Sequence, residues 1–297
     1  MKQSKGLTVT AYVVLMLFSL IALLPLILLF IASFTDNATA VANGYSYFPA
    51  KWSVEAYKYI IDEWTLIGKG YLNTALVTVV GTVGSLIVTS MFAYGLTVKD
   101  LPGQKVLSFL VVFSMLFNGG IVATYFVYTN VLDVRDSYLA LILPSLFMNG
   151  FNIILVSNYF RNSVAVDLLE AARIDGASEL LVYWKILLPL SKPMLATIGI
   201  MTAIGYWNDW TNGLYFLSAR DGQRYYTIQL ILNQINDNVN FLASNAAQMG
   251  VTINVSQIPT TTVRMAIAAV GIIPLLVAYP FFQKYFVKGI SLGGVKG

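Results

Sequence analysis

Residues 161–193, with the sequence RNSVAVDLLEAARIDGASELLVYWKILLPLSKP, decide how the rest of the chain is interpreted. Asp167, followed three residues later by Glu170, fits a capping box, which predicts a helix that starts near Leu168. The dipeptide Asp175-Gly176 should end this helix, because glycine readily adopts the left-handed conformation that a tight helix end requires. The segment is therefore expected to turn sharply at a glycine elbow.

A second short helix is expected after the elbow, over residues 178–189. Its apolar side chains are Leu180, Leu181, Tyr183, Trp184, Leu187 and Leu188. Apolar surface of this extent is unfavourable in water, and large exposed apolar patches mark interaction sites. We therefore expect a partner surface to cover the two helices.

The composition of the whole chain places it in a membrane. Of its 297 residues, 57% are hydrophobic and 11% are charged, whereas about a quarter of the residues of a soluble domain are charged. The chain has no cysteine and no histidine, which excludes disulfides, thiolate and imidazole catalysis and the usual zinc ligand sets. Its net charge of +4 is modest and lies along membrane flanks, so it does not indicate nucleic-acid binding.

Apolar stretches predict an all-α membrane protein with six transmembrane helices. The first stretch follows Lys2 and Lys5 and could be taken for a cleavable signal. It continues from about Thr10 to Phe34, whereas a signal core has roughly 7 to 15 residues and a bilayer requires about 20. We interpret it as a retained span. The six predicted spans cover residues 10–34, 72–98, 106–129, 138–159, 194–217 and 262–286.

Positive charges predict the orientation, because cytoplasmic loops of membrane proteins are enriched in lysine and arginine. With a cytoplasmic N-terminus, eleven of the 18 lysines and arginines lie inside. Residues 1–9 and the tail 287–297 are then cytoplasmic and flank a transmembrane domain over residues 10–286. Within this domain, the segment 161–192 is expected to be cytoplasmic and the loop 218–261 external.

Prolines and small residues in the predicted spans indicate kinks and close helix contacts. Kinks are expected at Pro25, Pro144, Pro274 and Pro280, since membrane helices tolerate proline where neighbours satisfy the freed backbone groups. The second span carries Gly81, Gly84 and Ser85. Such small residues suit close packing against another helix.

The cytoplasmic segment resembles the EAA signature of ABC-importer permeases. The matching residues are Glu170, Ala171, Ala172, Asp175, Gly176, Ala177, Ile186, Leu188 and Pro189. The resemblance implies the type I importer permease fold and a coupling helix that docks into a groove of an ATP-binding subunit. Glu170 would then pair with a basic residue of the ATPase, the two alanines after it would permit close approach, and Gly176 would allow the elbow. Alternatively, Glu170 only caps its helix and Asp175 only shapes the turn.

The resemblance also implies partner proteins: a second homologous permease subunit, two ATP-binding subunits and an extracellular or periplasmic substrate-binding protein. The phosphate-cradling spacing G-x-x-x-x-G-K-[ST] does not occur in this chain. We therefore expect a non-catalytic subunit that binds no cofactor, with ATP-Mg used by partner subunits. The tail residues Gly293, Gly294 and Lys296 resemble the end of a maltose-importer permease that inserts between the ATPase subunits. A frayed terminus is the alternative.

Polar side chains inside the predicted spans are candidates for a substrate pathway, because they are unfavourable in lipid. They are Asn118, Tyr125, Asn149, Asn152, Trp207, Asn208 and Asp209. Amides and a carboxylate beside flat aromatic rings suit sugar recognition. Trp207 and Trp210 could instead belong to the outer interfacial belt, with Asn212 ending the helix. By resemblance, the loop 218–261 would dock the substrate-binding protein; otherwise it is an external cap.

Together with this resemblance, the sequence predicts a permease subunit of an ATP-driven, binding-protein-dependent importer in a bacterial plasma membrane. It looks most similar to multiple-sugar and polysaccharide permeases of Gram-positive bacteria, would form half of the pore and would work by alternating access. A permease for peptides or polyols is the alternative within the family. An ion-coupled secondary carrier is less favoured, since such carriers usually show internal repeats and membrane-embedded carboxylates or histidines.

Overall fold

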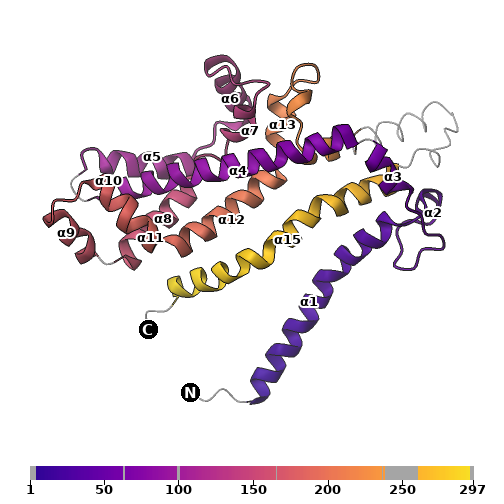
Figure 1. The fold of residues 1–297 in the computed structure, drawn as a ribbon, viewed down its shortest axis with the longest axis horizontal. Helices are drawn as coiled ribbons and strands as arrows, with labels where there is room; N and C mark the ends of the chain where they lie inside the picture. The colour runs from indigo at the N-terminus through magenta and orange to yellow at the C-terminus, as the bar shows by residue number, and fades with distance from the viewer. Residues whose placement is uncertain are drawn as a thin grey trace. The chain divides into compact units, whose positions relative to one another are not determined.

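The structure, a computed structural model, describes residues 5–62, 64–98, 101–164, 166–235, 237 and 260–294, without the side chains of residues 5, 166, 167, 260 and 281–294. The regular structure of this part of the chain is helical, apart from an isolated antiparallel bridge between Thr35 and Trp52 (Figure 1). The chain divides into two compact units, residues 1–68 with 231–274 and residues 69–230 with 275–297. The predicted helical fold is confirmed for the described residues.

Three of the described helices are long and apolar enough to cross a membrane. They are α1 (Lys5–Ser33), α4 (Trp64–Gly95) and α15 (Thr260–Gly294). A fourth span results if two helical stretches that meet at 80°, Glu179–Leu190 and Lys192–Asn208, cross as one bent pair. The long helices therefore account for three or four of the six predicted spans.

The first unit contains α1, α2 (Asn37–Asn43) and α3 (Glu55–Asp62). The most apolar window of α1 has a mean hydropathy of 3.1 and is 0% buried within the chain, as expected for a helix that contacts lipid or another membrane subunit. Asp36 caps α2 by accepting the Thr39 N–H at 3.2 Å and pairs with Lys51 at 3.2 Å. Burial opposes ionisation of Asp36, but its hydrogen bonds with Lys51 and Thr39 lower its pKa below the usual value.

The second unit combines the rest of α4 with a series of shorter helices. In chain order these are α5 (Gln104–Leu116), α6 (Gly120–Phe126), the π-helical turn η1 (Val127–Val131), α7 (Tyr138–Ile142), α8 (Gly150–Ser163), α9 (Val166–Ile174), α10 (Glu179–Val182), the π-helical turn η2 (Tyr183–Leu187), α11 (Leu188–Leu190), α12 (Lys192–Asn208), α13 (Thr211–Phe216) and the 3₁₀ turn η3 (Gln223–Tyr225). Figure 1 shows α4, α5, α8 and α12 running along one another. The apolar core between these elements contains Ala93, Tyr94, Leu96, Val111, Ile153, Val156, Phe160, Val164, Leu169, Val182, Tyr183, Leu187, Met194 and Ile198.

Three predicted spans are interrupted. The third breaks at residues 117–119 between α5 and α6, the fourth at residues 143–149 between α7 and α8, and the fifth between α12 and α13. Left-handed backbone marks the first two breaks, with φ 76° at Gly120 and 65° at Ser145. Pro144, a predicted kink, lies in the second break, whereas α1 and α15 run through their prolines. The expectation of continuous helices is wrong at these places, because apolar composition permits a helix without excluding a break.

Side chains satisfy backbone carbonyl groups beside the break at residues 143–149. The Tyr206 hydroxyl donates to the Ile142 carbonyl oxygen at 2.8 Å. The Asn212 side chain donates to the Pro144 carbonyl oxygen at 3.1 Å. Irregular backbone in a membrane domain needs such partners, because lipid offers none. Residues of α12 and α13 thus hold the break of another predicted span in place.

Replacing Tyr206 with phenylalanine should destabilise the second unit. The Tyr206 side chain is 1% exposed, so water cannot replace the lost donor, and a buried unsatisfied carbonyl costs about 1–3 kcal/mol. We expect Tyr206→Phe to lower the thermal denaturation midpoint of the purified protein in detergent. Tyr215→Phe, at a tyrosine that is 42% exposed, is the matched control and should change the midpoint little. An equal decrease in both variants would contradict this role of the Tyr206 hydroxyl.

Small residues on α4 permit close contacts, as the sequence predicts. A Cβ atom at Gly81 would lie 2.5 Å from the Tyr206 ring, and one at Gly84 would lie 2.7 Å from the Phe147 ring. The Ser85 hydroxyl donates to a carbonyl oxygen of the second break at 3.3 Å. One face of α4 therefore packs directly against α12 and against the interrupted fourth span.

Candidate functional site

α9 and α10 meet at the predicted glycine elbow. Gly176 has φ 86°, in the left-handed region, and its N–H donates to the Arg173 carbonyl oxygen at 3.0 Å. The Ala177 N–H donates to the Ala172 carbonyl oxygen at 3.0 Å. These two bonds form a Schellman motif, which closes the end of α9. Ser178 then caps the first turn of α10, so the predicted order of helix, glycine turn and helix is confirmed.

The bounds of the two helices differ in detail from the prediction. α9 starts at Val166, two residues before the expected position, so Asp167 lies inside the helix. The predicted capping box is wrong, because an N-cap residue precedes the helix. The second helix forms in three pieces, α10, η2 and α11. The π-helical turn η2 shifts the helical register part-way along the segment.

One face of the second helix is open. Leu180, Leu181 and Trp184 are 64%, 50% and 52% exposed, whereas Val182 and Tyr183 between them are buried. The segment therefore packs one side on the core of the second unit and leaves a second apolar side exposed.

The residues of the EAA-like motif divide between the open surface and the core. Glu170, Ala171, Asp175, Gly176 and Pro189 are exposed. Ala172, Ala177, Ile186 and Leu188 pack against the apolar core. Ile174, which the motif does not include, is 85% exposed at the end of α9. We call the exposed set Glu170, Ile174, Leu180, Leu181 and Trp184 the elbow surface.

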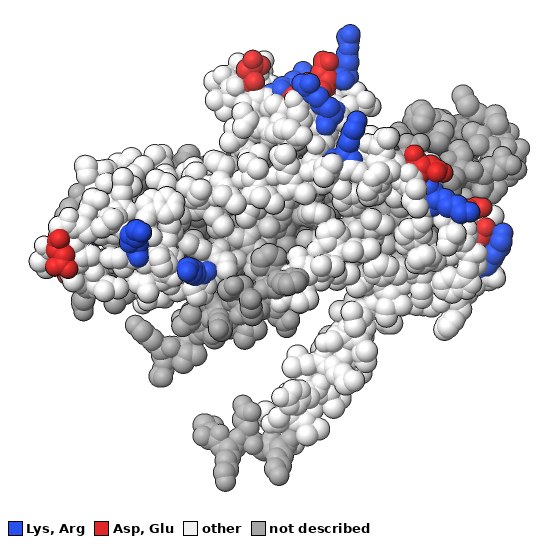
Figure 2. All heavy atoms as spheres, in the orientation of Figure 1, with Lys and Arg blue, Asp and Glu red and all other residues white. Residues whose placement is uncertain are grey.

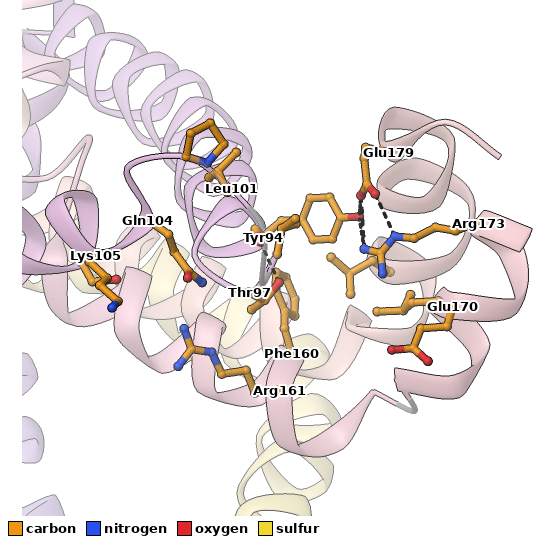
Figure 3. A pocket seen from close by; sticks show the side chains of 15 residues that line it. Tyr94, Thr97, Leu101, Gln104, Lys105, Phe160, Arg161, Glu170, Arg173 and Glu179 are labelled. Atoms are coloured by element: carbon orange, nitrogen blue, oxygen red, sulfur yellow. Dashed lines mark hydrogen bonds and ion pairs between the residues drawn. The ribbon is translucent and has the colours of Figure 1, made fainter. Parts of the chain in front are cut away.

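A cavity of about 1000 Å³ lies beside the elbow (Figure 3). Glu170, Arg173 and Glu179 line it on the elbow side, and Gln104, Lys105 and Arg161 line it on the opposite side. Gln104 and Arg161 both donate to the Leu96 carbonyl oxygen, just beyond α4. They satisfy one of the carbonyl groups that a helix end leaves without an internal partner.

Tyr94, Arg173 and Glu179 form a hydrogen-bonded cluster on the wall of this cavity (Figure 3). The Arg173 Nε lies 2.8 Å from the Glu179 Oε1, and the Tyr94 hydroxyl donates to the same carboxylate. A terminal guanidinium nitrogen of Arg173 lies 3.4 Å from the Tyr94 hydroxyl oxygen. Hydrogen bonding to Glu179 raises the pKa of the Arg173 guanidinium above its already high value.

Sequence reasoning did not identify this cluster. Arg173 and Glu179 carry opposite charges on either side of Gly176, which is the signal that could have indicated an ion pair. Tyr94 lies 79 residues before Arg173, and its position in the apolar end of a predicted span gives no indication of a polar partner.

The predicted pathway residues in the third and fourth spans lie at or near the helix breaks. The Asn118 side chain accepts the first N–H of α6 at 2.9 Å, and Asn149 caps α8 by accepting the Asn152 N–H at 3.2 Å. Asn152 is buried, and Tyr125 stacks on Phe216 with ring centres 6.0 Å apart. Asn118 and Asn149 therefore have a structural role in starting helices, and a role in substrate passage stays a prediction.

The predicted pathway residues of the fifth span lie where α12 gives way to α13. Asp209 accepts the N–H groups of Thr211 and Asn212, the first two residues of α13, at 3.0 and 3.2 Å. Asn208 donates to a carbonyl oxygen of α12 at 3.0 Å, and Trp207 is partly buried. The polar residues of the three interrupted spans are thus distributed over three separate breaks.

The tail and much of the outer loop extend beyond the described residues. Gly293 and Gly294 form the end of α15, while Lys296 lies outside the described residues. In the predicted loop 218–261, residues 236 and 238–259 also lie outside them.

The described start of the outer loop is anchored to the second unit. The Asp136 carboxylate accepts the backbone N–H and the hydroxyl of Ser218. The Asn73 amide donates to the carbonyl oxygens of Arg224 and Tyr226 at 2.9 and 3.0 Å. Figure 2 shows charged side chains gathered over the α6, α7 and α13 region and an uncharged face over the middle of α4. The described start of the outer loop therefore lies in a charged region of the second unit (Figure 2).

Long apolar helices are the mark of a multi-pass membrane protein. The helix breaks fit this class, because side chains of the same chain donate to carbonyl groups there. The chain belongs to the family of binding-protein-dependent transport system inner membrane components, whose family model matches residues 2–292. The predicted family is confirmed, and the chain is a membrane subunit of an ABC transporter.

Relatives and a solved structure agree with this assignment. The chain is 41% identical over 286 residues to the polygalacturonan/rhamnogalacturonan transport system permease protein YtcP of Bacillus subtilis, with 96% of each chain covered. It is 36% identical over 277 residues to protein LplC of Bacillus subtilis, with 93% of this chain and 90% of that protein covered. A crystal structure of a bacterial ABC transporter involved in the import of the acidic polysaccharide alginate contains a chain that matches with a TM-score of 0.77 and 32% identity, covering 96% of this chain and 99% of that one.

Proposed function

We propose that this chain forms half of the pore of an ATP-driven importer of oligosaccharides or polysaccharide fragments, and that its elbow surface docks on an ATP-binding subunit. The elbow surface carries the proposal. Its four apolar side chains are exposed, while the opposite faces of the two helices pack on the apolar core. Exposed apolar surface of this kind favours a protein partner. Glu170 adds an exposed carboxylate that a basic residue of the partner can bind through charge-assisted hydrogen bonds.

The substrate class follows from the relatives. The names of the similar permease and of the similar transporter refer to polygalacturonan, rhamnogalacturonan and alginate, which are polysaccharides. A peptide or polyol substrate has no comparable support. An ion-coupled carrier is also disfavoured, since such carriers rely on membrane-embedded carboxylates and the Asp209 carboxylate has a structural role, accepting backbone N–H groups at the start of α13.

Six membrane crossings result if each interrupted span crosses as a pair of helices. These pairs are α5 with α6, α7 with α8, and α12 with α13. The other three crossings are α1, α4 and α15. Both termini and the elbow surface then lie in the cytoplasm, where ATP-binding subunits use ATP-Mg. A second permease subunit completes the pore, and a substrate-binding protein delivers its ligand to the external loop. Gly293, Gly294 and Lys296 would reach the ATP-binding subunits.

Alternating access supplies the mechanism. Closure of the two ATP-binding subunits on ATP would move α9 through the docked elbow surface and shift the pore from inward-facing to outward-facing. A partner can shift such an equilibrium only by contacting the two states differently. The elbow surface, being connected to the core by α9 and by the α10–α11 segment, provides that contact.

Single introduced cysteines can test both the docking and the side of the membrane on which each residue lies, because the chain has no cysteine of its own. Ile174→Cys carrying a benzophenone maleimide should cross-link to the ATP-binding subunit on illumination, whereas Arg220→Cys in the outer loop should not. In right-side-out vesicles, a membrane-impermeant maleimide should label Arg220→Cys but label Ile174→Cys only after detergent is added. Labelling of Ile174→Cys in intact vesicles, or cross-linking from Arg220→Cys alone, would contradict the proposal.

A further inference from the structure

The cluster of Tyr94, Arg173 and Glu179 joins three elements at the elbow. Tyr94 lies in the last turn of α4, Arg173 in the last turn of α9, and Glu179 is the first residue of α10. Arg173 contacts the Glu179 carboxylate through two nitrogens, at 2.8 and 3.3 Å. Since Arg173 precedes Gly176 and Glu179 follows it, this ion pair closes across the glycine turn.

The turn is open on one side. A Cβ atom at Gly176 would have nothing within 4 Å, although Ala177 beside it packs against the apolar core. α9 contributes Leu169 to the core, with Ala172 packed against it, and Glu170 beside them faces the cavity of about 1000 Å³. Within the described side chains, the hydrogen bonds from Arg173 are the polar links from α9 to α4 and α10.

The exposure of the ion pair indicates a geometric role. The side chains of Arg173 and Glu179 are 34% and 51% exposed, and ion pairs this exposed add little to stability. Tyr94, in contrast, is buried, and its ring packs 5.7 Å from the ring of Tyr183. A buried ring on α4 thus presents its hydroxyl to a charged pair that spans the elbow, which fixes the position of the elbow relative to α4.

We propose that Tyr94 is a positioning residue that ties the elbow to α4 through Glu179 and Arg173, so that α4 moves with α9 when an ATP-binding subunit moves the elbow surface. The inference rests on the proposed function, because it requires the elbow surface to dock on that subunit. The Tyr94 hydroxyl has no part in binding substrate or ATP, and its effect is on the coupling between ATP hydrolysis and transport.

Tyr94→Phe tests the link, because it keeps the buried ring and removes the hydroxyl. In the reconstituted complex, we expect the number of substrate molecules imported per ATP hydrolysed to fall about tenfold, as for the loss of one hydrogen bond to a charged group. Glu179→Ala, which removes the acceptor of that hydrogen bond, should lower the same ratio. The double variant should be no worse than the more impaired single variant, because both changes break the same bond. Additive effects, or a wild-type ratio in Tyr94→Phe, would overturn the proposal.

Tyr183→Phe is the matched control. Tyr183 also joins its segment to α4 by a buried hydroxyl, which lies 2.7 Å from Ser90 Oγ, but it does not contact α9 through that bond. Ser90 keeps the Leu86 carbonyl oxygen as a partner at 2.6 Å, so this variant should keep the wild-type import ratio. A decrease equal to that of Tyr94→Phe would show general loosening of α4 and overturn the link.

The docking experiment separates this inference from the proposed function. If Ile174→Cys cross-links to the ATP-binding subunit while Tyr94→Phe retains the wild-type ratio, docking stands and the link through Tyr94 is wrong. If Ile174→Cys does not cross-link although the complex is intact, docking through the elbow surface is wrong, and the link loses its basis.

Discussion

Uptake should fall at least about tenfold when Glu170 is replaced by lysine, because a carboxylate that meets a basic groove becomes a like charge facing it. Glu170 is exposed on α9, beside Ala171 and one turn before Ile174, so the substitution changes the elbow surface without disturbing the core. We expect the Glu170→Lys complex to show reduced transport in reconstituted vesicles and weaker binding of the ATP-binding subunit in co-purification. Glu170→Gln, which removes the charge alone, should have an intermediate effect.

Asp175→Asn provides the control for Glu170→Lys. Asp175 is exposed at the same elbow but is not part of the elbow surface, and asparagine can shape the turn equally well. Uptake by the Asp175→Asn complex should stay close to that of the wild-type complex. Wild-type uptake by Glu170→Lys in an intact complex would count against docking through α9.

Folded protein should be largely lost when Gly81 is replaced by leucine. A Cβ atom at Gly81 would lie 2.5 to 2.8 Å from three atoms of the Tyr206 ring. That ring is buried and its hydroxyl is held by the Ile142 carbonyl oxygen at 2.8 Å, so α4 and α12 must separate to admit a side chain. Overpacking of this kind costs about 1–3 kcal/mol, and occasionally more. We expect a low yield of monodisperse protein and a lower thermal denaturation midpoint.

The Gly81 prediction has a control on the same helix. A Cβ atom at Gly95 would meet Leu101 at 3.7 Å, an ordinary van der Waals contact, so Gly95→Ala should leave the midpoint unchanged or raise it slightly. Gly81→Ala should lower the midpoint. Combining it with Tyr206→Leu, which removes the ring, should cost less than the sum of the two single changes. If the changes in the denaturation midpoint were fully additive, Gly81 and Tyr206 would not be in steric contact.

The elbow could be predicted from the sequence because its determinants are local. Gly176 supplies the left-handed conformation, and the neighbouring helical residues supply the closing hydrogen bonds. The membrane character of α1 and α4 could also be predicted from the sequence, since an uninterrupted apolar run long enough to cross a bilayer is typical of a membrane helix. In both cases, the residues that determine the structure lie close together in the sequence.

The helix breaks and the Tyr94 cluster could not be predicted, because they depend on residues far apart in the sequence. Pro144 indicated a kink, but the turn around it is sustained by a donor from Asn212, 68 residues later. Likewise, the hydroxyl of Tyr94 finds its partner in Glu179, 85 residues later. A polar residue such as Asp209 looks the same in a sequence whether it caps a helix or faces a pore.

The exposure of the elbow surface affects how the cell treats the subunit before it assembles. A newly inserted copy without partners would present Ile174, Leu180, Leu181 and Trp184 to water, which are the kind of side chains that chaperones and proteases recognise. The same residues that make the subunit useful in a complex would mark an unassembled copy for removal. Its abundance would then depend on the supply of its partners, because copies in excess of them would be degraded.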